Sequence, residues 1–353
     1  MLAPALLVFI LLRIPSFFEP RWYTDEAGYL STAQAAMRGA VLYSQTWTNK
    51  PPIQIWLVAV PLRLFGPSEA GLHALTFLSG LLALAAVAWG ARAVLSPTRA
   101  FLATLAYAVA VGSPAFDAQI AVPESLLLAP VTWAGAILVA GVTRPDRPSS
   151  WWWRWGWTLT AGGLTGLALG IQQTCLADAG AFALILLLGS DHRWRDLGLF
   201  AAAGLGVTAA WLAPTVALAG TSPVYSSLVG FYRDYASFSA PPSTSARLLR
   251  AVGPLLAVVG AVLSRRRPGP TWALCLWATA VLAVAAAANR DYPHFLSPAL
   301  APGLLAVASL PGPRRARLRL LPLAAGLAVT SFFASVAWIE SKAIDAYINW
   351  PAA

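Results

Sequence analysis

The sequence predicts an all-α, polytopic integral membrane protein of about eleven spans, because the chain is apolar, poor in charge and built of long hydrophobic runs. Of its 353 residues, 58% are hydrophobic and only 11% are charged, and the mean hydropathy is +0.65. Soluble domains carry about 25% charged residues, so this composition argues against a soluble protein. Apolar runs of about 18 to 25 residues recur along nearly the whole chain, which is the length that a membrane-spanning helix requires.

The predicted spans follow one another along the chain, and we expect residues 1–353 to form a single transmembrane domain with no separate soluble domain. The spans are expected at residues 1–18, 69–92, 99–113, 122–142, 156–171, 175–190, 197–220, 246–264, 271–288, 294–310 and 320–340. The first run lacks a basic start and a small-residue cleavage site, and it therefore indicates a retained helix rather than a signal peptide. Cys175 and Cys275 are expected near opposite membrane faces, which argues against a disulfide or a metal site built on them.

The net charge of +10 indicates membrane orientation. With the amino terminus inside, the inner loops carry fourteen of the 24 Lys and Arg residues and three acids, whereas the outer loops carry the other ten and eleven acids. This is the positive-inside distribution, and it is clearest in the inner stretches SRRRPGP and PGPRRARLR. The basic excess is expected to contact anionic membrane lipids, and no nucleic-acid partner is predicted.

The outer side holds two long polar connections, at residues 19–68 and 221–245. Long polar loops gathered on one face often carry function. The second connection mixes aromatic side chains with Arg233 and Asp234. Aromatic faces suit the stacking of a sugar or lipid and the anchoring of a protein at a membrane interface alike, so the sequence leaves both possibilities open.

The first connection is expected to fold into two juxtamembrane helices. Thr24 is a suitable N-cap, Asp25 and Glu26 fall in the first turn, and Gly39 ends the first helix. Pro51 can open a second helix of about 15 residues, which is too short to span a bilayer and suits its interface. Each helix has an apolar face at helical spacing: Leu30, Ala33, Ala36 and Met37 on the first, and Ile53, Trp56, Leu57, Val60 and Leu64 on the second.

Three charged residues of this first connection have ordinary structural explanations. Asp25 and Glu26 would stabilise a helix start by about 0.3 to 1 kcal/mol, and Lys50 would extend along the interface towards the lipid headgroups. Neither explanation accounts for the clustering of all three in one loop of a chain that has so few charges.

The stretch TDEAGYL…AAMRGAVLY…TNKPPIQIWLVAVPLRLFGPSEAGLH resembles the opening of the GT-C glycosyltransferases. The resemblance is greatest to their bacterial branch, which is related to protein O-mannosyltransferases and the lipid A aminoarabinose transferase, and it is strong over about residues 20–80. It implies that Asp25 is the catalytic carboxylate, that Lys50 lies beside the phosphate of the donor lipid, and that Tyr43 contacts substrate.

Three further stretches on the outer side resemble the same family. In SPAFDAQIAVPESLLLAP, Glu124 matches the family's second acidic position, Asp117 competes for that role, and the plainer alternative for Glu124 is a helix-start acid. Gln172 and Gln173 stand where many relatives have Lys-Gln. They are expected either to bond sugar hydroxyls or only to satisfy backbone in a tight turn.

The third stretch, NRDYPHFLSPALAP, opens the tenth predicted span. Arg290, Tyr292 and His294 are expected to hold the donor phosphate there, since a guanidinium forms paired hydrogen bonds with phosphate. The alternative is an exposed pair of Arg290 with Asp291 beside an interfacial tyrosine. The run WWWRWGW, residues 151–157, is predicted to anchor the protein at the inner interface only.

These observations predict the transfer of a sugar from a polyprenyl-phosphate lipid to an acceptor hydroxyl. The expected place is the outer, periplasmic face of the bacterial cytoplasmic membrane, and the resemblance implies inversion at the sugar. Asp25 would be the base, Lys50 and Arg290 would clamp the phosphate, and Glu124 or Glu26 would orient substrate or a divalent metal. The acceptor is a glycan, lipid or protein.

Two other classes stay open. The first is a secondary transporter or lipid flippase, although transporters place charged residues near the membrane midplane and often have repeated halves. The second is a member of the same family that only binds lipid. The absence at Gln172 of the lysine that many relatives have would suit this class.

Overall fold

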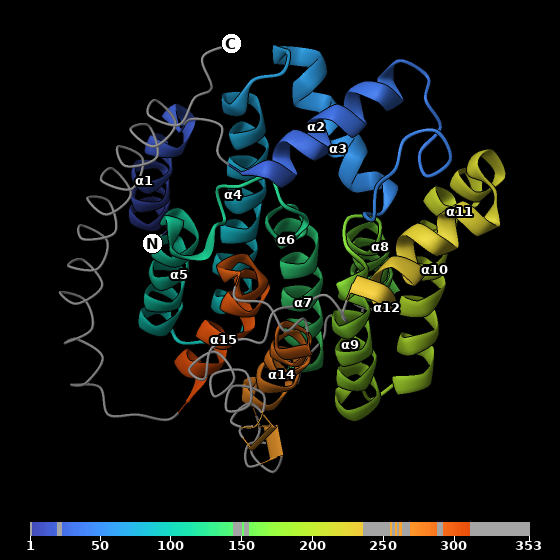
Figure 1. Ribbon diagram of the computed structural model, residues 1–353. Helices are drawn as coiled ribbons and strands as arrows, with labels where there is room; N and C mark the ends of the chain where they lie inside the picture. Colours follow the sequence, from blue (N-terminus) through green and yellow to red (C-terminus); the bar gives the residue numbers. More distant parts are fainter. Residues whose placement is uncertain are drawn as a thin grey trace.

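The computed structural model describes residues 2–19, 23–143, 150–151, 155–235, 269–287 and 292–310, together with a few residues between 255 and 262. Within these ranges the chain forms helices and no strand, apart from one isolated bridge between Leu42 and Thr46 (Figure 1). This part of the prediction, an all-α chain, is confirmed.

Most of the helices run along one direction, and two helices cross them at one end (Figure 1). The long and intermediate ones are α1 (Leu2–Arg13), α4 (Glu69–Val94), α5 (Pro97–Gly112), α7 (Leu128–Thr143), α8 (Trp157–Leu169), α9 (Leu176–Gly189), α10 (Arg193–Ala219), α14 (Thr271–Ala287) and α15 (Ser297–Ser309). The crossing helices are α2 (Thr24–Met37) and α3 (Pro52–Phe65).

The predicted spans before residue 220, and those at 271–288 and 294–310, coincide with helices. The predicted span at 320–340 lies outside the described residues, and that at 246–264 lies almost wholly outside them. Among the described helices, α4 and α10 are each long and apolar enough to cross a membrane. The others are shorter, so the predicted number of spans stays a prediction.

The span predicted at 122–142 is divided in two. A short helix, α6 (Pro123–Leu126), precedes α7, and the chain turns at Leu127 between them. Pro130 explains the break, because it has no N–H to offer the carbonyl of Leu126. The Ser79 hydroxyl of α4 instead donates to the carbonyl oxygens of Ser125 and Leu126, at 2.8 and 3.1 Å.

The first part of the connection predicted at 221–245 is helical, over residues 221–235. Gly220 ends α10 in the left-handed region, with φ at 87°, where glycine carries no steric cost. The chain then restarts as α11 (Thr221–Tyr225), the π-helical turn η5 (Ser226–Gly230) and α12 (Phe231–Tyr235). Residues 236–245 lie outside the described residues.

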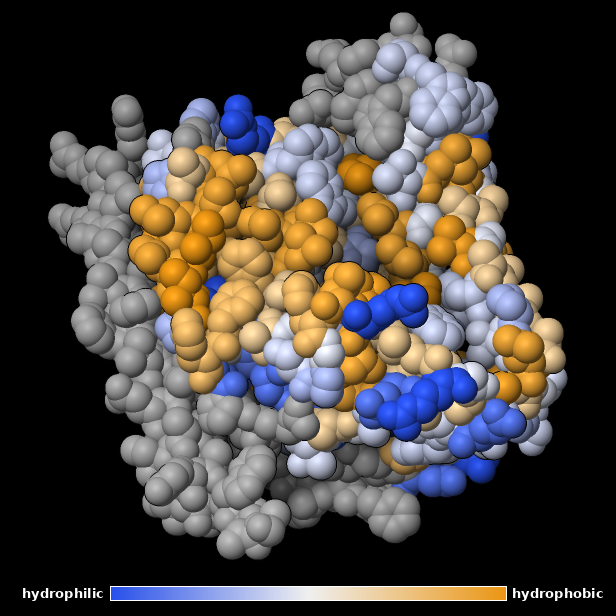
Figure 2. All heavy atoms as spheres, turned by 90° about the horizontal axis from the view of Figure 1, so that it is seen from above, coloured by the Kyte–Doolittle hydropathy of each residue, from blue (hydrophilic) through white to orange (hydrophobic). Residues whose placement is uncertain are grey.

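The two helices of the first connection form where they are predicted. The N-cap position of α2 is Tyr23 rather than Thr24, and Met37 is 40% exposed, whereas Leu30, Ala33 and Ala36 are buried as expected. On α3, the large side chains Trp56, Val60 and Leu64 are exposed, as expected for a helix face that contacts lipid. Figure 2 looks onto this end of the molecule, where hydrophobic residues form large surface areas.

The helix bundle buries one of the tryptophans of WWWRWGW and both cysteines. Trp157 is fully buried against Gly141 of α7, so anchoring at the interface is wrong for this residue of WWWRWGW, whereas Trp151 is 66% exposed. Cys175 and Cys275 are both free and buried.

Candidate active site

A cavity of about 970 Å³ opens between the crossing helices and the bundle. Its walls come from the first turns of α2, the loop that precedes α3, α6, the turn before α9, α12, α14, and the 3-10 turn η7 (Pro293–Leu296). Six of the predicted site residues line it: Asp25, Lys50, Glu124, Gln172, Tyr292 and His294. The cavity therefore joins residues that are far apart in the sequence.

Asp25 stands at the mouth of the cavity, in the first turn of α2. Its side chain is exposed, and its Oδ2 atom accepts a hydrogen bond from the Tyr29 hydroxyl, one turn later, at 3.5 Å. Burial of Tyr29 and the charge of Asp25 raise the pKa of the Tyr29 hydroxyl well above its usual value, so it stays a donor. The carboxylate is thus fixed from one side and open to the cavity on the other, which is the arrangement that a proton acceptor needs.

Lys50 lines the same cavity and is held in place by two tyrosines. Its Nζ donates to the Tyr232 hydroxyl of α12 at 3.3 Å, and its backbone carbonyl accepts from the Tyr43 hydroxyl at 2.8 Å. Burial lowers the pKa of Lys50, but the neighbouring Tyr232, Glu124 and Asp25 offset this, and the net pKa is raised. Lys50 therefore provides a cation at neutral pH. Tyr43 is buried and does not line the cavity, so its contact is with Lys50 rather than with a substrate.

Glu124 is a buried carboxylate in the first turn of α6. Its Oε1 atom accepts a hydrogen bond from Gln172 Nε2 at 2.8 Å. Gln172 and Gln173, two neighbours in the sequence, thus do different things. Gln172 lines the cavity beside Glu124, whereas Gln173 Nε2 donates to the backbone carbonyls of Asn49 and Leu228, at 3.0 and 3.2 Å. Gln173 thus has the second of the two roles expected for it, that of bonding backbone groups.

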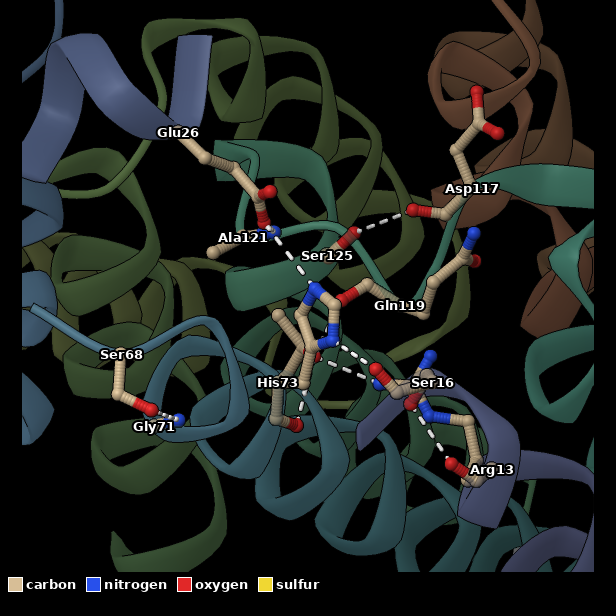
Figure 3. Close-up of polar contacts among 11 residues, drawn as sticks. Arg13, Ser16, Glu26, Ser68, Gly71, His73, Asp117, Gln119, Ala121 and Ser125 are labelled. Carbon is tan, nitrogen blue, oxygen red and sulfur yellow. Dashed lines mark hydrogen bonds and ion pairs between the residues drawn. The ribbon is translucent and has the colours of Figure 1, made fainter. Parts of the chain in front are cut away.

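Glu26 points away from the cavity into a buried polar cluster (Figure 3). Its Oε1 atom accepts from the backbone N–H of Ala121 at 2.5 Å and lies 3.8 Å from His73 Nε2, while His73 Nδ1 contacts the carbonyl of Ser16. Of the two acids that the sequence places side by side, Asp25 faces the cavity and Glu26 the protein interior. Glu26 therefore does not line the cavity with the other two predicted catalytic acids, and it bonds the loop before α6 instead.

The same cluster fixes the loop that leads into α6. The buried Arg13 of α1 donates from Nη2 to the Thr76 hydroxyl at 2.7 Å, and that hydroxyl bonds the carbonyl of Gln119 at 2.8 Å (Figure 3). The loop is thus tied to both α1 and α4, and it carries Asp117 at one end and Glu124 after the other.

His294 of η7 lines the cavity, and its imidazole is paired with Asp117, which does not line the cavity. The His294 Nδ1 and Asp117 Oδ2 atoms are 3.5 Å apart. The Tyr292 ring stacks on the imidazole at a centroid distance of 5.3 Å, and Tyr23 meets it edge-on at 6.1 Å. Asp117 can therefore orient His294 but does not compete with Glu124 for the cavity. Arg290, the third predicted phosphate ligand, lies outside the described residues.

Tyr232 and Asp178 line the cavity although the sequence pattern assigned neither of them to the site. Tyr232, the partner of Lys50, is one of several aromatic residues in its segment, and no spacing distinguishes it. Its neighbours Arg233 and Asp234, which the charge pattern emphasised, are exposed and paired with each other at 3.5 Å. Asp178 is a buried acid in the first turn of α9.

A group that could hold a metal ion is found outside the cavity. The ligand atoms of Glu26, Glu69 and His73 lie within 4.8 Å of one another, with Glu26 and His73 buried. Carboxylate and imidazole groups are ordinary metal ligands, but the Ala121 N–H and the Ser16 carbonyl already bond two of these side chains. None of these three residues lines the cavity, whereas the metal considered from the sequence would be held by carboxylates that converge at the site.

The chain has the GT-C fold that the sequence resemblance implied. No protein-family model and no curated protein sequence matches it, so the likeness rests on three-dimensional structure.

One similar structure is ArnT from Cupriavidus metallidurans bound to undecaprenyl phosphate. It is 21% identical with a TM-score of 0.66, over 87% of this chain and 58% of that one. Another is the archaeal oligosaccharyltransferase AglB from Archaeoglobus fulgidus, in complex with an inhibitory peptide and a dolichol-phosphate. It is 12% identical with a TM-score of 0.58, over 96% of this chain and 56% of that one. The chain thus spans somewhat more than half the length of the proteins it resembles.

Proposed function

We propose that this protein is a membrane glycosyltransferase that moves a sugar from a polyprenyl-phosphate lipid to an acceptor hydroxyl. The observation that carries the proposal is the meeting of Asp25, Lys50 and Glu124 around one cavity. A cation and two carboxylates, brought together from α2, the loop before α3 and α6, provide the charges that this displacement needs.

The reaction is a displacement at the anomeric carbon of the sugar. The acceptor oxygen forms a bond to that carbon while the bond from the carbon to the phosphate oxygen breaks, and the bonding pair leaves with the polyprenyl phosphate. Asp25 takes the proton of the acceptor hydroxyl, since its carboxylate is open to the cavity. Attack opposite the leaving phosphate gives the inverted product.

The leaving phosphate gains negative charge as the bond breaks, and Lys50 is the group that stabilises it. A cation beside a developing charge favours the transition state over the bound donor. The Tyr232 hydroxyl holds the ammonium in place at 3.3 Å. His294 and Tyr292 of η7 line the same cavity and complete the phosphate subsite, and Glu124 with Gln172 orients the sugar.

The similar structures support the class of donor. ArnT is bound to undecaprenyl phosphate and AglB to a dolichol-phosphate, and both ligands are polyprenyl-type phosphates. The positive-inside distribution of Lys and Arg favours an outer, periplasmic position for the cavity in the bacterial cytoplasmic membrane. On that side no nucleotide sugar is available, and a lipid-linked donor fits. The acceptor is a glycan, lipid or protein hydroxyl.

The experiment measures release of polyprenyl phosphate from purified protein in lipid nanodiscs. The substrates are a panel of undecaprenyl-phosphoryl sugars with several acceptors, and mass spectrometry follows the product. Wild type is expected to release undecaprenyl phosphate with at least one donor. Asp25→Asn is expected to lose about 10²- to 10⁴-fold in rate, the usual contribution of a general base, while its donor affinity is nearly unchanged.

Asp234→Asn is the matched control, because Asp234 is an exposed acid of α12 that does not line the cavity. It is expected to keep the wild-type rate. An active Asp25→Asn variant would remove Asp25 as the base. Absence of release by wild type with every donor and acceptor would contradict the transferase and favour the transporter, flippase or lipid-binding alternatives, which a flux assay would then separate.

A further inference from the structure

Asp178 is an acidic residue that lines the cavity but has no role in the proposed transfer reaction. It lies in the first turn of α9, it is 4% exposed, and it lines the cavity together with Gln172 and Glu124. An acid buried in a membrane-spanning helix is costly and in most cases functional. Its surroundings indicate what it does.

The Trp277 indole fixes one oxygen of this carboxylate. Trp277 Nε1 donates to Asp178 Oδ1 at 2.7 Å, and the ring is fully buried in α14. Gly135 of α7 makes room for the indole, since a Cβ atom at that position would overlap the ring. Phe182 of α9 packs its edge against it, with centroids 5.3 Å apart. These contacts fix the position of the Trp277 N–H, and the hydrogen bond from it fixes the Asp178 carboxylate.

This arrangement leaves Asp178 able to accept a further hydrogen bond on the cavity side. No other side chain within the described ranges bonds the carboxylate. Besides Trp277, the carboxylate bonds its own backbone N–H, and its remaining acceptor sites can take an O–H or N–H donor from a molecule in the cavity. A sugar offers several hydroxyl donors, whereas the headgroup of a polyprenyl phosphate without its sugar offers at most the single P–OH of its monoanion, which is the minor form above about pH 6.

A structural role is the competing explanation. An acid in the first turn of a helix interacts favourably with the helix dipole, and the Trp277 bond satisfies part of its hydrogen-bonding capacity. That explanation requires no contact with a ligand, and so it predicts that sugar-bearing and sugar-free lipids respond in the same way to loss of the carboxylate.

We infer that Asp178 is a specificity-determining residue whose carboxylate, positioned by Trp277, accepts a hydrogen bond from a hydroxyl of the donor sugar. The inference rests on the proposed function for the nature of the ligand, a sugar carried on a polyprenyl phosphate. It does not depend on turnover, because the contact is made in the bound donor.

Asp178→Asn tests this directly by reversing the polarity of the site. The indole N–H is a donor only, so the amide oxygen of the new side chain faces Trp277 and its NH₂ group faces the cavity. The measurement is the affinity of purified protein for two probes, undecaprenyl phosphate and a panel of undecaprenyl-phosphoryl sugars, by native mass spectrometry in lipid nanodiscs. Wild type is expected to bind at least one sugar-bearing lipid more tightly than the bare lipid.

In Asp178→Asn, affinity for that sugar-bearing lipid is expected to fall about 10- to 100-fold, the usual loss for a hydrogen bond to a charged group, while affinity for undecaprenyl phosphate is unchanged. Trp277→Phe is expected to show the same selective loss, because it releases the carboxylate. Asp191→Asn, the same change at an exposed acid outside the cavity, is expected to alter neither affinity.

Three results would overturn the inference: equal loss of affinity for both probes, no loss for either, or a wild-type protein that binds no sugar-bearing lipid more tightly than the bare one. Failure of the proposed function has a different signature. Selective loss of sugar binding in Asp178→Asn, combined with no release of undecaprenyl phosphate by wild type, would leave the sugar contact in place and remove the transferase.

Discussion

Lys50 and Tyr232 form the contact on which the proposed phosphate subsite depends. Lys50 is half-buried and the nearest partner of its ammonium is a neutral hydroxyl, that of Tyr232, which in turn donates to the carbonyl of Asn49 at 3.3 Å. Burial raises the pKa of Tyr232 by more than Lys50 lowers it, so the pair consists of a cation and a protonated phenol rather than of two ions.

Tyr232→Phe is expected to lower the pKa of Lys50, because burial remains while the hydroxyl is lost. The raised pKa of wild type keeps Lys50 charged from neutral into alkaline pH. In the variant the activity lost on deprotonation is therefore lost at lower pH, and at the alkaline end the rate is about tenfold below wild type. The measurement is the pH profile of undecaprenyl phosphate release.

Tyr225→Phe serves as the control for this pH profile, since Tyr225 is an exposed tyrosine of the neighbouring α11. It is expected to follow wild type. A Tyr232→Phe profile whose alkaline side coincides with that of wild type would show that the Tyr232 hydroxyl does not set the charge of Lys50.

At this scale the sequence predicted Asp25, Lys50 and Glu124 because rare charges stand in a recognisable order, and the structure brings all three to one cavity. Helical spacing alone could not separate Asp25 from Glu26, since both fall in the first turn of α2 and one residue of helix rotation decides which faces inward; it was the family resemblance that assigned the base to Asp25. The sequence could not select Tyr232 either, because that choice depends on how α12 meets the loop carrying Lys50.

Among the helices, α8 and α10 approach most closely through glycines. A Cβ atom at Gly162 of α8 would overlap the backbone carbonyl of Phe200 on α10, and one at Gly166 would overlap the carbonyl of Gly204. Small residues let membrane helices pack backbone against backbone, where lipid provides no hydrophobic force to join them. α10 also packs against α9 and α3, but only 6% of its apolar segment is buried, so the close contact with α8 is an important part of its support.

Gly162→Ala is expected to destabilise the protein by about 1 to 3 kcal/mol, the usual cost of overpacking a tight contact, because the obstruction is backbone and cannot rotate away. Gly163→Ala is the control, since the nearest atom to its new Cβ is Val207 Cγ2 at 3.8 Å. The thermal midpoint in detergent is expected to fall for the first variant and to stay or rise for the second. Equal midpoints would contradict the close approach.

Hydropathy and turn residues predicted the helices well wherever a run ended in a charged or glycine-containing turn. They missed the division between α6 and α7, because it depends on the Ser79 hydroxyl of another helix, which bonds the carbonyls of Ser125 and of Leu126, the latter left without a helical donor by Pro130. They also missed the helical restart after Gly220, where polar and aromatic residues resemble a loop in composition yet fold along the end of α10.

Over the whole molecule, two segments far apart in the sequence gather at one end. The juxtamembrane helices α2 and α3 lie across the bundle there, and α11 and α12 reach the same end (Figure 1). The cavity between them combines a charged wall at Asp25 and Lys50 with an apolar wall of α14 that includes Val281 and Val284. A ligand with a phosphate, a sugar and a long hydrocarbon chain matches both walls.

The most direct test of this account is a cryo-electron microscopy structure of the wild-type protein in nanodiscs with undecaprenyl phosphate. We predict density for the phosphate in the cavity, within hydrogen-bonding distance of Lys50 Nζ and the Tyr232 hydroxyl, with the hydrocarbon chain leaving towards α14. Phosphate density outside the cavity, with Lys50 still bonded to Tyr232 alone, would contradict the assignment of this cavity as the donor site.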